Sequence, residues 1–277
     1  MGKKRGSSAN TLFANRLFEW VQSQSKMVKI LLALTAMISS LAALKSCVTN
    51  YNNFFIAREF VHAVGITALI YKLTTLKTCS GLSLQTQELT AIVLAARISC
   101  SVDIGFDIHT ALDITAFVST AWVIYMMRNK LYVSYNEHLD KTPKSYLLIP
   151  CAILAMFIHP DSSIPLFAQI RWAFGVYLEA IVVLPQLWMM HKTQMIEPYT
   201  ALYVFALGVA RFFGAAYWIL RVYESTETYL FLLGRGYFWV PMVIVSEMIQ
   251  TFILADFCYY YLKSVVSGNL LVRVPRV

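Results

Sequence analysis

The sequence predicts an all-α protein that crosses a membrane many times. Of its 277 residues, 58% are hydrophobic and only 14% are charged, and the mean hydropathy is +0.59. Soluble domains carry about 25% charged residues, so this composition is typical of a membrane protein. Eight apolar runs approach or exceed the roughly 20 residues that a helix needs to cross the hydrocarbon core: Met27–Leu44, Phe54–Leu73, Leu89–Phe106, Thr110–Met127, Tyr146–His159, Leu166–Met190, Tyr199–Val222 and Phe238–Leu262.

These runs divide the chain into four parts. We expect a basic cytosolic lead at residues 1–26, an extra transmembrane helix at 27–46, a seven-helix core at 54–263 and a cytosolic tail at 264–277. Tyr146–His159 is short for a span and would need snorkelling by Lys144 or local thinning of the bilayer. Three longer runs precede it in the core and three follow it, which is the layout of two helical bundles joined by a linker.

Two segments of the core repeat each other. Each has a Lys-Thr pair, a polar loop and then an apolar helix with an arginine at its middle, which is Arg97 in the first segment and Arg211 in the second. The helix before each loop also carries an ionisable residue, His62 or Glu179. Membrane proteins with internal repeats build a central site in this way. Because a charge inside an apolar helix is costly, we expect these side chains to point inward and to be functional.

The net charge of +8 follows a topology rule rather than a nucleic-acid signal. Lysines and arginines gather in alternate loops, whereas the opposite loops hold little beyond Lys45 and Arg235. That asymmetry is the positive-inside pattern, and it places both termini in the cytosol. The basic residues of the expected cytosolic side are Lys3, Lys4, Arg5, Arg16, Lys26, Lys72, Lys77, Arg128, Lys130, Lys141, Lys144, Lys192, Lys263, Arg273 and Arg276.

No motif of the sequence indicates an enzyme. There is no nucleophile triad or phosphate-binding loop of credible spacing. The five cysteines show no CxxC or metal-ligand spacing, so we expect no metal and no other cofactor, and we interpret most cysteines as packing residues. They are Cys47, Cys79, Cys100, Cys151 and Cys258.

Four motifs follow one another along the core. The first joins His62, Lys72, the run Lys77-Thr78-Cys79-Ser80-Gly81-Leu82-Ser83 and Arg97. The second joins Trp172, Tyr177-Leu178-Glu179-Ala180, Leu184-Pro185-Gln186-Leu187 and Lys192-Thr193. The third joins Tyr203, Leu207-Gly208, Arg211, Trp218 and Arg221, and the fourth joins Gln250-Thr251 and Ala255-Asp256-Phe257-Cys258. Together they cover about residues 54–265 and resemble the KDEL receptors, which are the ER lumen protein-retaining receptors.

The resemblance implies an architecture as well as a family. Pro185-Gln186 is similar to the PQ-loop proteins and sugar transporters, in which two pseudo-repeated three-helix bundles are joined by a linker helix. The extra span Met27–Leu44 resembles the added first helix of the plant ERD2-like branch. A core that starts in the lumen, with one span before it, again places the N-terminus in the cytosol.

The resemblance implies a receptor in the Golgi and endoplasmic reticulum membrane. Such receptors bind C-terminal retention signals of luminal ER proteins at acid pH and return these proteins to the ER. The implied partners are C-terminal peptides of ER luminal proteins, vesicle coat machinery and membrane lipid, with no nucleic acid. Two alternatives stay open: a small-solute transporter of the related two-bundle architecture, and a receptor-derived Golgi trafficking protein that has lost signal binding.

The resemblance also assigns roles to residues. It places Arg97 and Arg221 as ligand-binding cations, because guanidinium groups bind carboxylates through paired hydrogen bonds. It places Trp172 and Trp218 as aromatic walls, His62 as the pH switch and Glu179 as a buried acid. Imidazole ordinarily titrates at about pH 6.5, which suits a switch. The remaining residues of the expected site are Arg211 as the ion-pair partner of Glu179, Arg58 near a family arginine replaced by Phe55, and Tyr217 in place of a family asparagine.

Several positions depart from the family pattern. Ile98, Ala210 and Gly214 stand where the family has tyrosines, and Cys100 and Gln169 replace acidic residues. Each buried hydrogen bond left unmade costs about 1–3 kcal/mol, so a standard signal peptide would lose specific contacts here. The sequence therefore leaves the preferred tetrapeptide open, and with it the question whether signal binding is retained.

Overall fold

The computed structural model describes residues 52–105, 108–161, 164–193, 195–224, 238–267 and 272–273. The expected basic lead and the extra span Met27–Leu44 lie outside the described residues, as does most of the expected tail. The described elements are α3 Asn52–Tyr71, α4 Leu84–Ile104, α5 Ile108–Tyr125, α6 Ser145–Phe157, α7 Leu166–Ile181, α8 Leu184–Thr193, β1 Met195–Ile196, α9 Pro198–Glu224, α11 Trp239–Val266 and β2 Val272–Arg273.

The structure confirms an all-α polytopic membrane protein. Within the described residues, four helical segments are long and apolar enough to cross a membrane: Thr110–Lys130, Leu166–Thr193, Pro198–Val222 and Trp239–Val266. Helix α6 is a shorter apolar helix of 13 residues, as the sequence predicts for the linker. Helices α3 and α4 have 20 and 21 residues, which is enough for a span by length. The count of eight spans stays a prediction.

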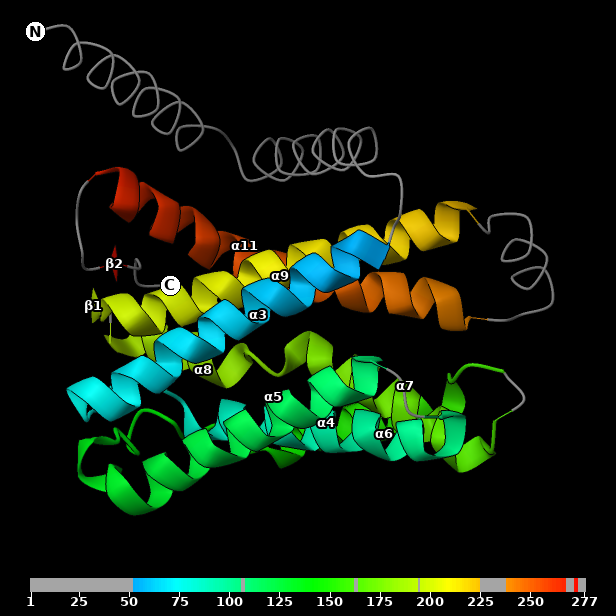
Figure 1. Cartoon of the computed structure of the whole chain (residues 1–277), viewed down its shortest axis with the longest axis horizontal. Helices are drawn as coiled ribbons and strands as arrows, with labels where there is room; N and C mark the ends of the chain where they lie inside the picture. Colours follow the sequence, from blue (N-terminus) through cyan, green and yellow to red (C-terminus); the bar gives the residue numbers. More distant parts are fainter. Residues whose placement is uncertain are drawn as a thin grey trace, which may run out of the picture.

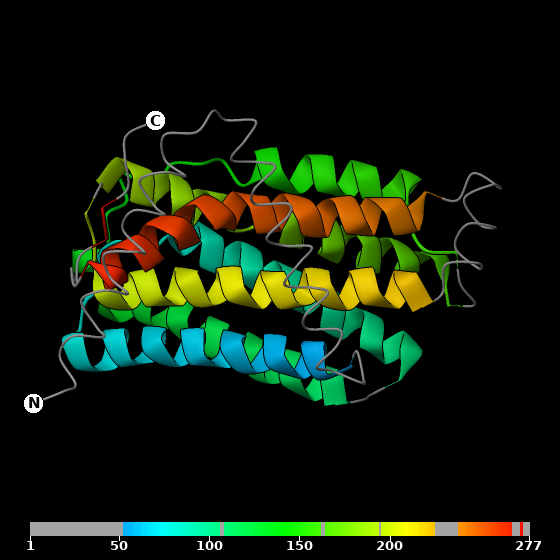
Figure 2. The same cartoon turned by 90° about the horizontal axis from the view of Figure 1, so that it is seen from above.

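Helices from the two halves of the core pack against each other. Helix α3 packs along α9, and α4 packs along α7 (Figures 1 and 2). Within the first half α5 contacts both α3 and α4, and within the second half α11 contacts both α7 and α9. The two halves thus make contacts of the same kind. Their description as two pseudo-repeated three-helix bundles joined by α6 stays a prediction.

The contact between α3 and α9 depends on a small residue. A Cβ atom built on Gly65 of α3 would lie 2.9 Å from the Cβ of Ala206 on α9. Carbon atoms that do not share a bond pack at about 3.5–4.0 Å, so any larger side chain would push the helices apart. Beside this contact, one apolar cluster buries Leu69 of α3, Leu73 just after α3, and Tyr203 and Val204 of α9.

The predicted run Leu166–Met190 is interrupted rather than continuous. Helix α7 ends at Ile181 and α8 begins at Leu184, just before Pro185. Proline has no N–H to bond the carbonyl four residues earlier, and its ring clashes with that carbonyl, so the helix breaks here. Gln186 then binds the loop before α4: its side chain accepts from the Ser83 N–H at 2.8 Å and donates to the Gly81 carbonyl at 2.8 Å.

Polar contacts join the loops at the end of the molecule that we expect in the cytosol. The fully buried Lys72 ammonium, just after α3, donates to the Thr200 hydroxyl at 2.6 Å and lies 2.8 Å from a Glu197 oxygen. The Asp140 carboxylate accepts from the Ser83 hydroxyl at 2.8 Å. Strands β1 and β2 pair antiparallel beside these loops. The segments after α3, α5, α8 and α11 therefore meet at one end.

The described cysteines are free and lie within the helical packing. Cys79, Cys100 and Cys151 are buried and Cys258 is half-buried. The Cys79 thiol, in the loop after α3, lies 3.1 Å from the Leu131 carbonyl oxygen and 3.2 Å from the Ser134 hydroxyl. Burial raises the pKa of this thiol above its ordinary value, which makes it a poor nucleophile. These positions agree with the interpretation of the cysteines as packing residues.

Candidate functional site

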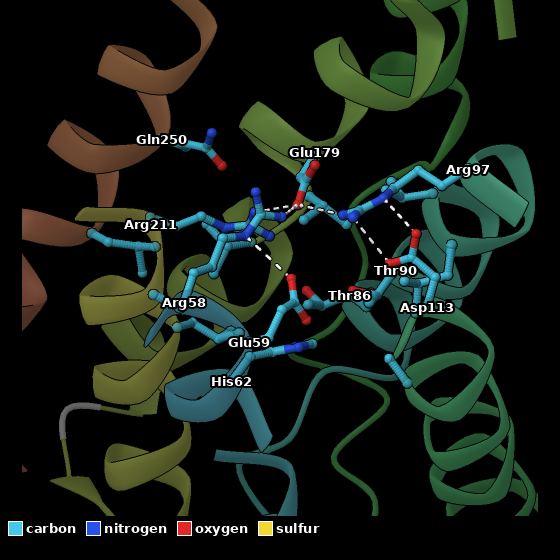
Figure 3. Close-up of a pocket in the computed structure, with 18 of the residues that line it drawn as sticks. Arg58, Glu59, His62, Thr86, Thr90, Arg97, Asp113, Glu179, Arg211 and Gln250 are labelled. Carbon is cyan, nitrogen blue, oxygen red and sulfur yellow. Dashed lines mark hydrogen bonds and ion pairs between the residues drawn. The ribbon is translucent and has the colours of Figure 1, made fainter. Parts of the chain in front are cut away.

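A polar cavity lies among the helices of the core, with an empty volume of about 750 Å³ that includes space open to solvent. It is lined from α3, α4, α5, α7, α9 and α11, so both halves of the core contribute (Figure 3). Its polar lining comprises Arg58, Glu59, His62, Thr86, Thr90, Arg97, Asp113, Glu179, Tyr203, Arg211 and Gln250.

One carboxylate oxygen of Glu179 organises the cavity. On α7, it accepts a hydrogen bond from Arg58 Nη2 of α3 at 2.8 Å and lies 3.5 Å from Arg97 Nη1 of α4. It also forms an ion pair with Arg211 of α9. Glu179 therefore sits between three guanidinium groups from three other helices (Figure 3). The expected pair with Arg211 is present, but it is one of three rather than an isolated pair.

Arg97 has a second acidic partner, Asp113 of α5. Its Nε lies 3.1 Å from Asp113 Oδ2, and its Nη2 lies 3.0 Å from Asp113 Oδ1. This is the two-point contact that a planar guanidinium makes with a carboxylate. The Asp113 side chain is 8% exposed, so the pair is mostly desolvated. Arg97 thus bridges α5 and α7 from its place on α4.

His62 and Glu59 extend the polar lining along α3. His62 follows Arg58 by four residues, so both lie on one face of the helix and line the cavity. A Glu59 oxygen lies 3.7 Å from Arg58 Nε. With the carboxylates ionised, the three arginines of the lining face three acids, and the cavity is charge-balanced. Protonation of His62 would give it a net positive charge.

Helix α11 adds a buried acid beside this network. Glu247 is 6% exposed and accepts a hydrogen bond from the Gln250 amide at 2.7 Å. A Cβ atom built on Gly214 of α9 would lie 3.3 Å from Glu247 Oε2 and 3.6 Å from Arg58 Cδ. Gly214, one of the departures from the family pattern, therefore leaves the space that Arg58 and Glu247 use.

The other expected ligand residues form a separate group on α9 and α7, toward the end opposite the meeting loops. Arg221 donates to the Tyr217 hydroxyl at 3.1 Å, and its guanidinium carbon lies 5.4 Å from the centroid of the Trp218 ring. Trp172 packs edge-to-face on Trp239 with ring centroids 6.0 Å apart. None of Trp172, Tyr217, Trp218 and Arg221 is among the residues that line the cavity. Along α9, the ten residues from Arg211 to Arg221 rise about 15 Å.

Two further departures from the family pattern are packed between helices. The Cys100 thiol lies 3.4 Å from the Ala168 carbonyl oxygen. The Gln169 amide nitrogen donates to the Ile164 carbonyl at 2.9 Å, and its oxygen lies 3.1 Å from His159 Nδ1. Both side chains hold the start of α7 in place, which is a structural role for positions where acids are expected in the family.

The sequence predicts Arg58, His62, Arg97, Glu179 and Arg211 as site residues, and the structure brings these five together. Three further acids of this region are not among the predicted residues: Glu59, Asp113 and Glu247. Each lies within an expected apolar span, and an acid in such a place is itself a signal of an inward-facing polar group. Asp113 and Glu247 lie on helices outside the two Lys-Thr repeats, whereas Glu59 shares the helix of His62.

Comparisons with known proteins show which family the chain belongs to. The chain matches the sequence pattern of the ER lumen protein retaining receptor family over residues 78–221. It is 32% identical over 219 residues to ER lumen protein-retaining receptor erd-2.1 of Caenorhabditis elegans, an alignment that covers 79% of this chain and 96% of that protein. It is also 32% identical to the ER lumen protein-retaining receptor of Petunia hybrida, over 77% of this chain and 94% of that protein. The corresponding receptor of Entamoeba histolytica is 31% identical, over 79% of this chain and 97% of that protein. The chain is thus a member of the ER lumen protein-retaining receptor family.

Proposed function

We propose that this protein is a retrieval receptor for ER luminal proteins. It binds their C-terminal retention signals in the Golgi, more tightly at acid pH, and releases them in the ER. Family membership supports this function, and the observation that carries it is the cluster of Arg58, Arg97 and Arg211 in one cavity. Three guanidinium groups from three helices suit an anionic peptide end better than a neutral solute such as a sugar.

The spacing of Arg211 and Arg221 along α9 suits a short extended peptide. An extended chain spans about 3.3 Å per residue, so four residues span about 13 Å. That length is close to the rise of about 15 Å between Arg211 and Arg221 along α9. A peptide whose carboxylate lies near Arg97 therefore brings its upstream residues to Arg221, Trp218 and Trp172. Arg221 then meets acidic side chains of the signal, and the indole rings flank its apolar and cationic groups.

Acid pH favours the ligand through the charge of the cavity. The lining is charge-balanced with His62 neutral, and a proton on His62 makes it cationic. An anionic ligand binds a cationic cavity more tightly than a neutral one, so ligand and proton bind cooperatively. His62 is the residue to which we assign this switch, with Glu179 as the buried acid that holds the three arginines in register.

The receptor also has two further proposed partners, vesicle coat machinery and membrane lipid. Its apolar helices lie in the Golgi and ER membranes with both termini in the cytosol, so the loops that meet beside β1 face vesicle coat machinery. The exposed apolar side chains of the spans, among them Ile56 and Phe60 of α3, contact membrane lipid.

Binding of C-terminal peptides to the purified receptor tests the function. A panel of tetrapeptide-ended ligands at a Golgi-like and an ER-like pH should show acid-favoured binding by at least one carboxylate peptide. Amidation of that peptide should abolish binding, and so should Arg97→Ala. Arg128→Ala is the matched control, because Arg128 pairs with Glu88 and is not part of the cavity lining. An amidated peptide that binds as well as the free acid contradicts the proposal.

A further inference from the structure

Each side-chain nitrogen of Arg97 faces an acidic oxygen of the cavity. Its Nε and Nη2 face the two oxygens of Asp113, at 3.1 Å and 3.0 Å, and its Nη1 faces Glu179 at 3.5 Å. Figure 3 shows Arg97 held between these two acids. The pair with Asp113 has the geometry that an arginine and a peptide carboxylate would adopt. A ligand carboxylate therefore reaches the fork of Arg97 only when Asp113 leaves it.

We propose that Asp113 is a specificity-determining residue of the cavity. Its carboxylate pairs with Arg97 until the C-terminal carboxylate of the ligand takes its place. This inference rests on the proposed function and names how the site selects its ligand. The exchange is one for one: the two contacts from Arg97 to Asp113 break, and two contacts from Arg97 to the ligand carboxylate form. A C-terminal amide or ester carries no negative charge and cannot replace an ionised carboxylate at this fork.

The displaced Asp113 takes up a proton. Its side chain is 8% exposed, and a buried charge without a partner is costly, so the neutral acid is favoured after the exchange. The charged and titratable groups that face Asp113 are Arg97 on α4, Arg58, Glu59 and His62 on α3, and Glu179 on α7. Once Arg97 binds the ligand, the other groups do not replace it as a partner, because the acids repel Asp113 and Arg58 is held by Glu179. One solvent proton therefore binds an Asp113 oxygen for each peptide bound.

Substitutions of Asp113 and of His62 should then change ligand affinity in opposite directions. Both bind a proton with the ligand, so either one makes binding stronger as pH falls. Removal of His62 removes a positive charge that attracts the ligand, and it lowers affinity on the acid side. Removal of the Asp113 carboxylate instead removes a competitor, and it raises affinity on the neutral side. The direction of the change in affinity therefore separates the two residues.

The test is peptide binding to wild-type and Asp113→Asn receptors, with protons counted by calorimetry in buffers of different ionisation enthalpy. Asparagine keeps the size of the side chain but removes its negative charge, so it competes less strongly with the ligand carboxylate for Arg97. We expect peptide affinity at neutral pH to rise by about tenfold or more. We also expect one proton fewer to be taken up for each peptide bound, so that the change in affinity per pH unit becomes about tenfold smaller. Asp256→Asn, on the exposed surface of α11, is the control and should change neither quantity.

A second measurement covers the case in which Asp113→Asn fails to fold. The His62→Ala receptor should still take up one proton for each peptide bound, because Asp113 remains. No proton uptake in that variant, or unchanged affinity and proton count in a folded Asp113→Asn receptor, overturns the inference while the proposed function stands. Failure of both wild-type and Asp113→Asn receptors to bind any carboxylate peptide contradicts the proposed function, and the inference is overturned with it.

Discussion

Glu179 is the single residue on which most ion pairs of the cavity depend. Its Oε1 contacts Arg58, Arg97 and Arg211, so loss of one arginine leaves it two cations. Loss of Glu179 leaves three largely buried guanidinium groups: Arg97 keeps Asp113 and Arg58 keeps Glu59 at 3.7 Å, whereas Arg211 loses its ion pair. Breaking a buried pair by removing one partner costs about 3–5 kcal/mol.

We therefore expect Glu179→Gln to lower the stability of the ligand-free receptor by about 3 kcal/mol or more. Arg211→Ala should cost less, because Arg58 and Arg97 still neutralise the acid. Thermal unfolding in detergent measures both. Glu137→Gln, at an exposed loop residue, is the control and should stay within about 0.5 kcal/mol of wild type. An Arg211→Ala receptor as unstable as Glu179→Gln would show that Arg211 alone holds Glu179.

His62 gives a prediction about pH. If ligand binding favours the protonated imidazole, affinity is highest below the pH at which free His62 titrates and falls as pH rises past the point where the bound form loses its proton. His62→Ala should therefore make the pH profile between Golgi and ER values less steep, with the remaining slope due to Asp113, and lower affinity more at acid pH than at neutral pH. Peptide titrations across this range measure it. An unchanged profile would assign the switch to another group of the cavity.

Single residues of this site were predictable in part. Arg97, Arg211, Glu179 and His62 each lie within an apolar run, and the cost of an unpaired charge in lipid is enough to predict that they point inward. The pair of Arg211 with Glu179 was predicted and is present, but the other partners were not predictable, because a partner depends on how each helix is rotated about its axis. Asp113 shows this, since only the packing of α5 against α4 places it at the fork of Arg97.

At the scale of elements, the apolar runs predicted the helices to within a few residues. The expected span Thr110–Met127 is α5 at Ile108–Tyr125, and the expected short span Tyr146–His159 is α6 at Ser145–Phe157. The run Leu166–Met190 is broken before Pro185, and proline was the available signal. Which helices touch was not predictable from hydrophobicity, because lipid-facing and protein-facing apolar residues have the same composition.

The close approach of α3 and α9 gives a prediction about stability. Alanine normally stabilises a helix relative to glycine by about 0.5–1 kcal/mol. At Gly65 the new Cβ meets Ala206 at 2.9 Å, so Gly65→Ala should lower the thermal unfolding temperature despite this gain. At Gly175 the nearest side-chain atom is Arg97 Cγ at 3.7 Å, an ordinary contact, so Gly175→Ala should raise it. A stabilising Gly65→Ala would mean that α3 and α9 do not pack this closely.

At the scale of the whole molecule, the distribution of charge and the contacts between loops both group the same loops at one end of the helices. The loops predicted to be cytosolic from their lysines and arginines are the loops that meet at one end of the helices. There the Cys79 N–H donates a hydrogen bond to the Ser134 hydroxyl oxygen at 3.0 Å, which joins the loops after α3 and α5. Lys72 joins the first of these loops to Glu197, and the pairing of β1 with β2 brings the segment after α11 to the same end.

This common end gives the last prediction. If it is cytosolic, the segment after α11 lies in the cytosol, and a C-terminal tag on receptors in sealed microsomes should be digested by added protease. The core then starts in the lumen, so one further span at Met27–Leu44 brings the N-terminus to the cytosol, and an N-terminal tag should be digested as well. A tag placed between α9 and α11 should be protected until detergent opens the membrane. A protected N-terminal tag with a digested C-terminal tag would reduce the count to seven spans, whereas protection of the C-terminal tag would reverse the orientation of the core.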